Sequence, residues 1–83
     1  MSVTRYDLYQ EVKELIKDLT YGGEEEWAKA LRDAIRKGST STEIMMLIRG
    51  QLKLLRRTDT PERLQLGERI DEALRYIDTV LAP

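Results

Sequence analysis

Carboxylates are the residues best placed to do chemistry in this chain, because its 83 residues include neither cysteine nor histidine. Those two absences exclude disulfides and thiolate nucleophiles, and they remove the commonest general base and transition-metal ligand. Spacings of four, three and four residues would place four carboxylates along one side of a helix: Asp7, Glu11, Glu14 and Asp18. Such a row can ligate metal ions or present an acidic surface.

The metal interpretation is the weaker one. A di-iron helical bundle uses Glu-x-x-His motifs, which a sequence without histidine cannot supply. Lys13 and Lys17 lie on the same helix, so the row also fits a solvated face with ion pairs of roughly 0.2 to 0.5 kcal/mol each. We therefore expect no metal and no other cofactor. Two interpretations stay open, a solvated face and an acidic strip that docks on a basic partner, with Glu24 and Glu25 as its extension.

The segment Gly38-Ser39-Thr40-Ser41-Thr42 has the composition of a phosphate-binding loop. It lacks the closing Gly-Lys-Ser/Thr and follows an expected helix instead of a strand, which argues against nucleotide binding. Thr40 and Glu43 instead have the spacing of a capping box that starts a helix. Catalysis would then need a carboxylate or lysine with a shifted pKa in a pocket, and a domain this small has little room for one. We expect no enzymatic activity.

Apolar residues recur every three or four positions in four segments separated by glycine, hydroxyl or proline residues. The expected helices cover residues 4–20, 24–37, 41–57 and 61–81. Short connections and one apolar face per helix predict an all-α fold, a compact antiparallel bundle of four helices forming one domain over residues 1–83.

Three apolar features have two interpretations each. Trp27 is expected to anchor the core, where its truncation to alanine would cost roughly 3 to 5 kcal/mol, and the alternative is an exposed hot spot. Met45 and Met46 fill the core or form an adaptable binding surface. Near-heptad spacing on the fourth helix suits an intramolecular core or the seam of a homo-oligomeric scaffold, through Leu66, Ile70, Leu74, Ile77 and Leu81.

A basic patch is expected on the polar side of the third helix: Arg49, Lys53, Arg56 and Arg57. It permits a helix-turn-helix interpretation with this helix reading nucleic acid. The N-terminal end of a reading helix usually carries polar residues, whereas this one begins Glu43-Ile44-Met45-Met46. The net charge of -1 also argues against nucleic acid as a partner. Burial of Met45 and Met46 would discriminate between the two interpretations.

The sequence offers no sign of export or of membrane insertion. Its first residues, MSVTRYDLYQEVKEL, contain no apolar core of a signal peptide, and no stretch is long and apolar enough to cross a bilayer. We expect a soluble, cytoplasmic protein with no membrane partner.

Two segments carry a resemblance to a known group of proteins. Trp27-Ala28-Lys29-Ala30-Leu31-Arg32-Asp33-Ala34 followed by Gly38-Ser39-Thr40-Ser41-Thr42-Glu43-Ile44 resembles a pattern in small bacterial helical immunity proteins, which are encoded beside polymorphic and contact-dependent growth inhibition toxins. The resemblance covers roughly residues 24–55, and its motif residues are a packing face and a helix cap, so it transfers no binding residue.

This resemblance implies a cytosolic inhibitor that binds a cognate toxin domain, of nuclease type, and blocks its active site or an adjacent surface. Nucleases bind phosphate backbones through basic sites, and an acidic strip on a rigid helix would complement such a site. Charge reversal at Glu11 and Glu14 is then expected to weaken binding without unfolding the monomer. Nucleic-acid binding through the basic patch and self-association remain the alternatives.

Overall fold

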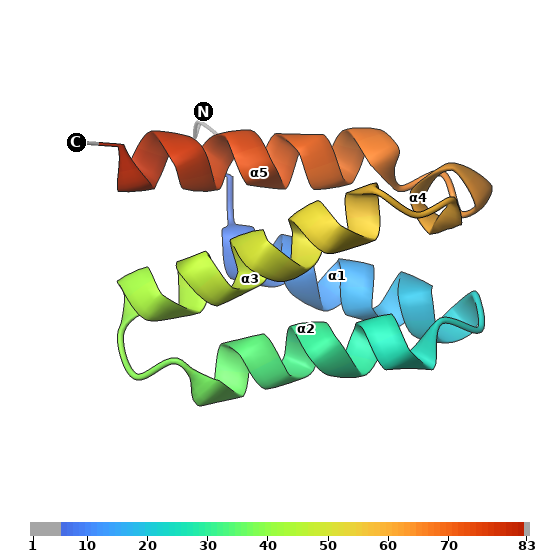
Figure 1. Cartoon of the computed structure of the whole chain (residues 1–83), viewed down its shortest axis with the longest axis horizontal. Helices are drawn as coiled ribbons and strands as arrows, with labels where there is room; N and C mark the ends of the chain where they lie inside the picture. Colours follow the sequence, from blue (N-terminus) through green and yellow to red (C-terminus); the bar gives the residue numbers. More distant parts are fainter. Residues whose placement is uncertain (1–5, 83) are drawn as a thin grey trace, which may run out of the picture.

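Four long helices run alternately in opposite directions in the computed structural model, which describes residues 6–82. The helices are α1 (Leu8–Tyr21), α2 (Glu25–Lys37), α3 (Ser41–Arg56), the single turn α4 (Thr60–Arg63) and α5 (Gly67–Leu81), and these residues contain no strand. α1 packs on α2, α2 on α3 and α3 on α5, while α1 also touches α5 (Figure 1). The expected antiparallel helical bundle is confirmed.

Side-chain caps fix where α1 and α3 begin. The Asp7 carboxylate accepts a hydrogen bond from the backbone N–H of Gln10 at 3.1 Å, so α1 begins at Leu8. The expected start at residue 4 is wrong for residues 6 and 7, which precede the helix, and the expected residues 4 and 5 lie outside the described part of the chain. At α3, Thr40 Oγ1 accepts from the backbone N–H of Glu43 at 3.1 Å. Glu43 in turn accepts from the backbone and hydroxyl of Ser39 at 2.8 and 2.7 Å, one residue earlier than an ordinary capping box.

The prediction of one continuous helix over residues 61–81 is wrong. The chain breaks between α4 and α5, where Gln65 adopts a left-handed φ of 59°. Leu66 is fully buried and Leu64 packs against the core from two positions earlier. Because residues two apart point in nearly opposite directions on a helix, a continuous helix could not bury both leucines.

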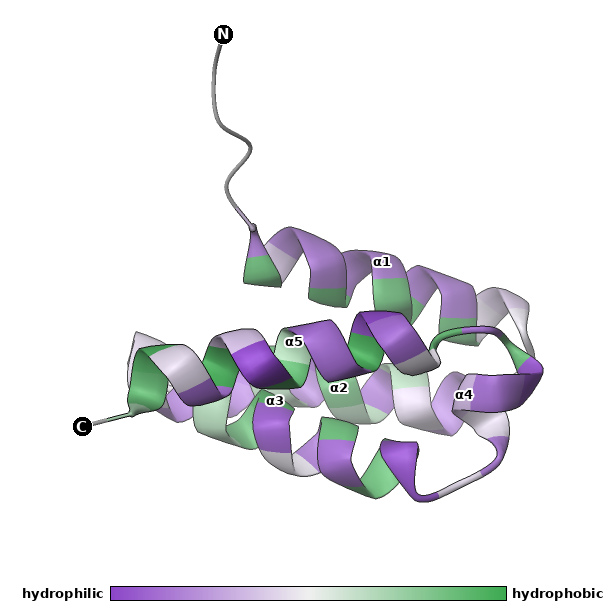
Figure 2. Cartoon of the chain, turned by 90° about the horizontal axis from the view of Figure 1, so that it is seen from above, coloured by the Kyte–Doolittle hydropathy of each residue, from purple (hydrophilic) through white to green (hydrophobic). Residues whose placement is uncertain are grey.

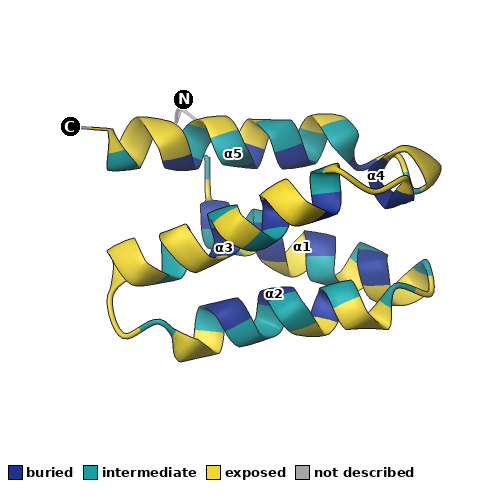
Figure 3. Cartoon of the chain, viewed as in Figure 1, coloured by how far each residue is buried: buried dark blue, intermediate teal, exposed yellow. Residues whose placement is uncertain are grey.

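The core is aliphatic and is drawn from all four long helices. Figure 2 shows the hydrophobic segments of α1 on the side that faces the other helices, and Figure 3 shows the buried residues there. Trp27 is half-buried at the edge of this core. The near-heptad row of α5 belongs to the core of the single chain, since Leu66, Ile70 and Ile77 are fully buried, with Leu74 and Leu81 packed beside them.

Candidate functional site

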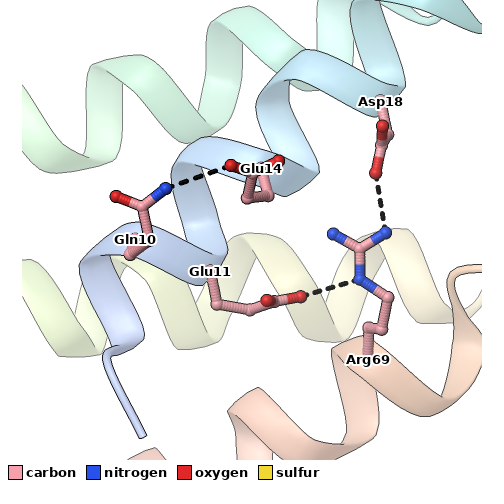
Figure 4. A network of polar contacts seen from close by, with 5 residues as sticks. All are labelled: Gln10, Glu11, Glu14, Asp18 and Arg69. Carbon is pink, nitrogen blue, oxygen red and sulfur yellow. Dashed lines mark hydrogen bonds and ion pairs between the residues drawn. The ribbon is translucent and has the colours of Figure 1, made fainter.

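The expected acidic strip lies on the flank of α1 that faces α5. There the guanidinium of Arg69, from α5, joins two of the four carboxylates, as Figure 4 shows. Its Nε donates to Glu11 at 2.8 Å and its Nη1 donates to Asp18 at 2.6 Å. Burial acts to lower the pKa of Arg69, but hydrogen bonds to Asp18 and Glu11 and their charges outweigh it and raise that pKa above its ordinary value. We call this three-residue contact the Arg69 clamp.

The other two carboxylates of the strip make only local contacts within α1. Asp7 caps the helix, and Glu14 accepts a hydrogen bond from the side-chain amide of Gln10 at 3.0 Å (Figure 4). Both residues are exposed, and neither forms an ion pair within residues 6–82. Their charges are therefore available to a partner.

A fifth carboxylate, Glu72 of α5, extends the strip across the helix boundary. Glu72 lines the same shallow hollow as Tyr6 and Tyr76, and its charge acts on the Tyr6 phenol, as does that of Glu11. Burial, assisted by these two carboxylates and opposed by Arg69, raises the pKa of Tyr6 to about 12. The Tyr6 ring lies 4.9 Å from the ring of Tyr76, and its buried hydroxyl has no hydrogen-bond partner among the described residues.

We call five carboxylates on α1, its N-cap and α5 the acidic face: Asp7, Glu11, Glu14, Asp18 and Glu72, of which Glu11 and Asp18 contact Arg69. Two guanidinium groups offset part of this negative charge, that of Arg69 and that of Arg75, which lines a hollow beside Glu72. The Arg69 clamp fixes Glu11 and Asp18 relative to α5, whereas Asp7, Glu14 and Glu72 are exposed outside the clamp.

The expected extension into the next helix is largely occupied by contacts within the chain. Glu24 forms an ion pair with Arg63 of α4. Glu25 forms an ion pair with Arg32, which lies seven residues further along α2. A hydrogen bond from Arg32 lowers the pKa of Glu25. These two carboxylates contribute less free charge to a partner than Glu14 does.

The expected basic patch on α3 is divided. Arg49 donates to Asp78 at 2.7 Å, and Arg56 donates to the two oxygens of Asp71 at 2.9 and 3.3 Å, so α5 neutralises both arginines. Lys53 and Arg57 are exposed and form no ion pair within the described part of the chain. Met45 is half-buried against the core, whereas Met46 is 57% exposed.

Sequence patterns did not identify Arg69 or Glu72 as members of this surface. Arg69 lies 58 residues from Glu11 and 51 residues from Asp18, and no local spacing rule relates positions so far apart. The available signal was weak: Arg69 is a basic residue beside acidic neighbours, Glu68 and Asp71, on an otherwise ordinary helix surface. Only the packing of α5 against α1 brings the guanidinium to the strip.

The described residues show neither a metal cluster nor a membrane-spanning helix. No group of three or more acidic side chains within residues 6–82 is arranged to hold a metal ion. None of the helices in this range is both long enough and apolar enough to cross a bilayer. The hollows are open depressions, such as one of about 420 Å³ along α5 and one of about 360 Å³ at the end of the bundle, which is lined by Tyr6, Tyr9, Met45 and Tyr76.

Comparisons with protein-family models, with curated proteins and with solved structures found no match for this chain.

Proposed function

We propose that this protein is an immunity protein, a cytoplasmic inhibitor that binds and neutralises a cognate toxin domain of nuclease type. The acidic face is the observation that carries the proposal, because it presents five carboxylates, two of which Arg69 holds in place. The resemblance of residues 24–55 to immunity proteins of contact-dependent growth inhibition systems supports the same function.

Charge complementarity explains how such a face would inhibit a nuclease. The active site of a nuclease attracts phosphates with lysine and arginine side chains, and carboxylates compete for those cations. Glu14 and Glu72, which are exposed and form no ion pair within residues 6–82, would approach the partner first. Glu11 and Asp18 would act mainly by holding Arg69, and through it α5, in place.

Rigidity favours binding without a large ordering cost. The face lies on two long helices whose inner sides are fully buried, so no backbone segment of the face must be ordered when the partner binds. Inhibition by surface docking also needs no deep pocket in the inhibitor, in keeping with the shallow hollows of this bundle.

The first test is a pull-down of the tagged chain from its own host, followed by identification of the recovered proteins. We expect a stoichiometric toxin domain, which is then purified and assayed for nuclease activity with and without the inhibitor. Activity that persists under saturating inhibitor, or recovery of no partner protein, would contradict the proposal.

The structure also decides which reversals test the face. Glu14→Lys with Glu72→Lys changes the charge without touching the Arg69 clamp, whereas reversal of Glu11 would also disturb the contact between α1 and α5. Asp59→Lys with Glu62→Lys, two exposed positions at and beside α4, changes the net charge by the same amount and is the matched control. We expect the double reversal to slow association about tenfold or more at low salt and the control to leave it unchanged.

A further inference from the structure

The outward side of α3 exposes large apolar side chains that the bundle does not cover. Leu47 is 41% exposed, Leu54 is 49% exposed and Met46 is 57% exposed, and Figure 3 shows much of this helix as exposed. Single exposed apolar residues are common on protein surfaces, but α3 carries three of the five large apolar side chains that are exposed among the described residues, and we call these three the α3 patch.

Gly50 lies at the middle of this patch, and the single chain gives no reason for a glycine there. A Cβ built on Gly50 would meet nothing within 4 Å, so packing within the bundle leaves room for a side chain. Glycine is also the least favourable residue in a helix interior apart from proline. One physical use of a glycine at such a position is to let a second backbone approach closely.

The residues around Gly50 are arranged as one helical seam with opposite charges at its ends. Glu43, Leu47, Gly50, Leu54 and Arg57 follow one another at intervals of four, three, four and three positions, the spacing of a helix-pairing face. Glu43 uses only Oε1 for its bonds to Ser39, and its Oε2 has no hydrogen bond within the described residues. Arg57 is exposed at the other end of the seam.

We propose that this seam binds a second copy of the chain, with the two α3 helices antiparallel and a two-fold axis passing beside Gly50. That symmetry places residues equally distant from Gly50 opposite each other. Glu43 of one copy then faces Arg57 of the other at both ends of the contact. Inside these ion pairs, Met46 faces Leu54.

Self-complementarity is the reason to choose a second copy as the occupant. The alkyl stem of Lys53 faces Leu47 in the same register and covers it, so each exposed apolar side chain of the seam gains a partner. A parallel pair would instead set Glu43 against Glu43 and Arg57 against Arg57, which like charges oppose. Every group that the antiparallel contact needs is already present on one chain.

The dimer leaves the acidic face free. α3 packs against α2, α4 and α5 but makes no close backbone contact with α1, so the seam and the carboxylates of α1 lie on separate helices. Figure 1 shows α1 beyond α3 in the bundle. Self-association and partner binding therefore involve different residues and are tested by different variants.

Sedimentation equilibrium of the full chain at micromolar to millimolar concentrations tests the proposal. One pair of helices buries less than the roughly 1,600 Å² of a standard interface, so we expect a reversible and weak dimer. Leu54→Lys should raise its dissociation constant about a hundredfold, because each change occurs twice in the dimer and places lysine against Met46. Val80→Lys, at a position 45% exposed on α5, is the matched control and should leave the constant unchanged.

Exchanging the charges of Glu43 and Arg57 tests the register of the two α3 helices in the dimer. Arg57→Glu sets two carboxylates together at each end and should weaken the dimer about tenfold. Adding Glu43→Arg in the same chain reverses both ends and should restore most of the affinity, with circular dichroism confirming that the helices remain folded. A monomer at every concentration, or a dimer that Leu54→Lys and Arg57→Glu leave intact, would overturn the proposal.

Discussion

Arg69 and Asp18 lie 51 residues apart in the sequence, yet the guanidinium of the first donates to the carboxylate of the second at 2.6 Å. The same guanidinium also donates to Glu11, so one side chain of α5 holds two positions of α1 that lie about two helical turns apart. The acidic strip is therefore a structural contact and a candidate binding surface at once. Replacing a carboxylate of the clamp removes a contact between two helices as well as a surface charge, whereas replacing Glu14 removes a charge and one exposed hydrogen bond within α1.

The Arg69 clamp should contribute measurably to stability. Arg69→Met keeps the aliphatic stem and removes both ion pairs, and we expect the free energy of unfolding to fall by about 1 kcal/mol, since partly exposed pairs contribute less than 1 kcal/mol each. Urea unfolding followed by circular dichroism measures the difference. Arg32→Met is the control, because its partner Glu25 lies on the same helix, and it should have the smaller effect. Equal losses in the two variants would contradict a clamp between helices.

Tyr6 should make the protein sensitive to alkaline pH. Its folded-state pKa is raised from 10.0 to about 12, so the folded state holds the phenolic proton more tightly than the unfolded state. The contribution of Tyr6 to the free energy of unfolding is therefore complete below pH 10 and is lost as the pH rises toward 12. Ultraviolet titration of phenolate absorbance should show a late step that Tyr6→Phe removes and Tyr21→Phe leaves in place.

The same substitution should cost little stability at neutral pH. The Tyr6 hydroxyl is buried and has no hydrogen-bond partner among the described residues, so phenylalanine removes a desolvated polar group and breaks no observed bond. A large loss of stability in Tyr6→Phe would indicate that the hydroxyl has a partner.

Asp71 should contribute to the loss of stability in acid. A hydrogen bond from Arg56 lowers the pKa of Asp71 below its ordinary value of 3.8, so the folded state releases this proton more readily than the unfolded state. The resulting stability is present above that ordinary value and is lost as the pH falls through the folded-state pKa. Asp71→Asn should flatten the dependence of the unfolding free energy on pH in this range.

A double-mutant cycle isolates the Asp71 contact. Arg56→Met removes the hydrogen-bond partner of Asp71 and should flatten the pH dependence of the unfolding free energy in the same range. Combining it with Asp71→Asn should flatten this dependence no further. Additive effects of the two substitutions would show that the acid dependence arises elsewhere.

Two glycines should respond to alanine in opposite ways. A Cβ at Gly38 would lie 2.8 Å from the backbone nitrogen of Ile44, so Gly38→Ala forces the connection between α2 and α3 to shift and should lower the melting temperature. A Cβ at Gly50 meets nothing, and Gly50→Ala should stabilise α3 by up to about 1 kcal/mol through helix propensity. Thermal unfolding at a low protein concentration measures both variants without a contribution from self-association.

Local chemistry was sufficient to predict most of the elements. Thr40 and Glu43 have the spacing of a helix cap, and the structure places the start of α3 there because the contact involves only neighbouring residues. The break between α4 and α5 was missed because Pro61 and the apolar spacing beyond it favour a helix without interruption. Burying Leu64 and Leu66 on one core requires the break, and that requirement arises from packing.

The sequence by itself determined the helical class, the caps, the apolar faces and the row of carboxylates on α1, because each depends on residues within one or two turns of each other. Tertiary structure alone decided which charges remain available. It joined Glu11 and Asp18 to Arg69, neutralised Arg49 and Arg56 against α5, and left Glu14 and the outward side of α3 uncovered. These outcomes depend on which helices become neighbours, and that choice is made by the burial of a shared core rather than by any local spacing.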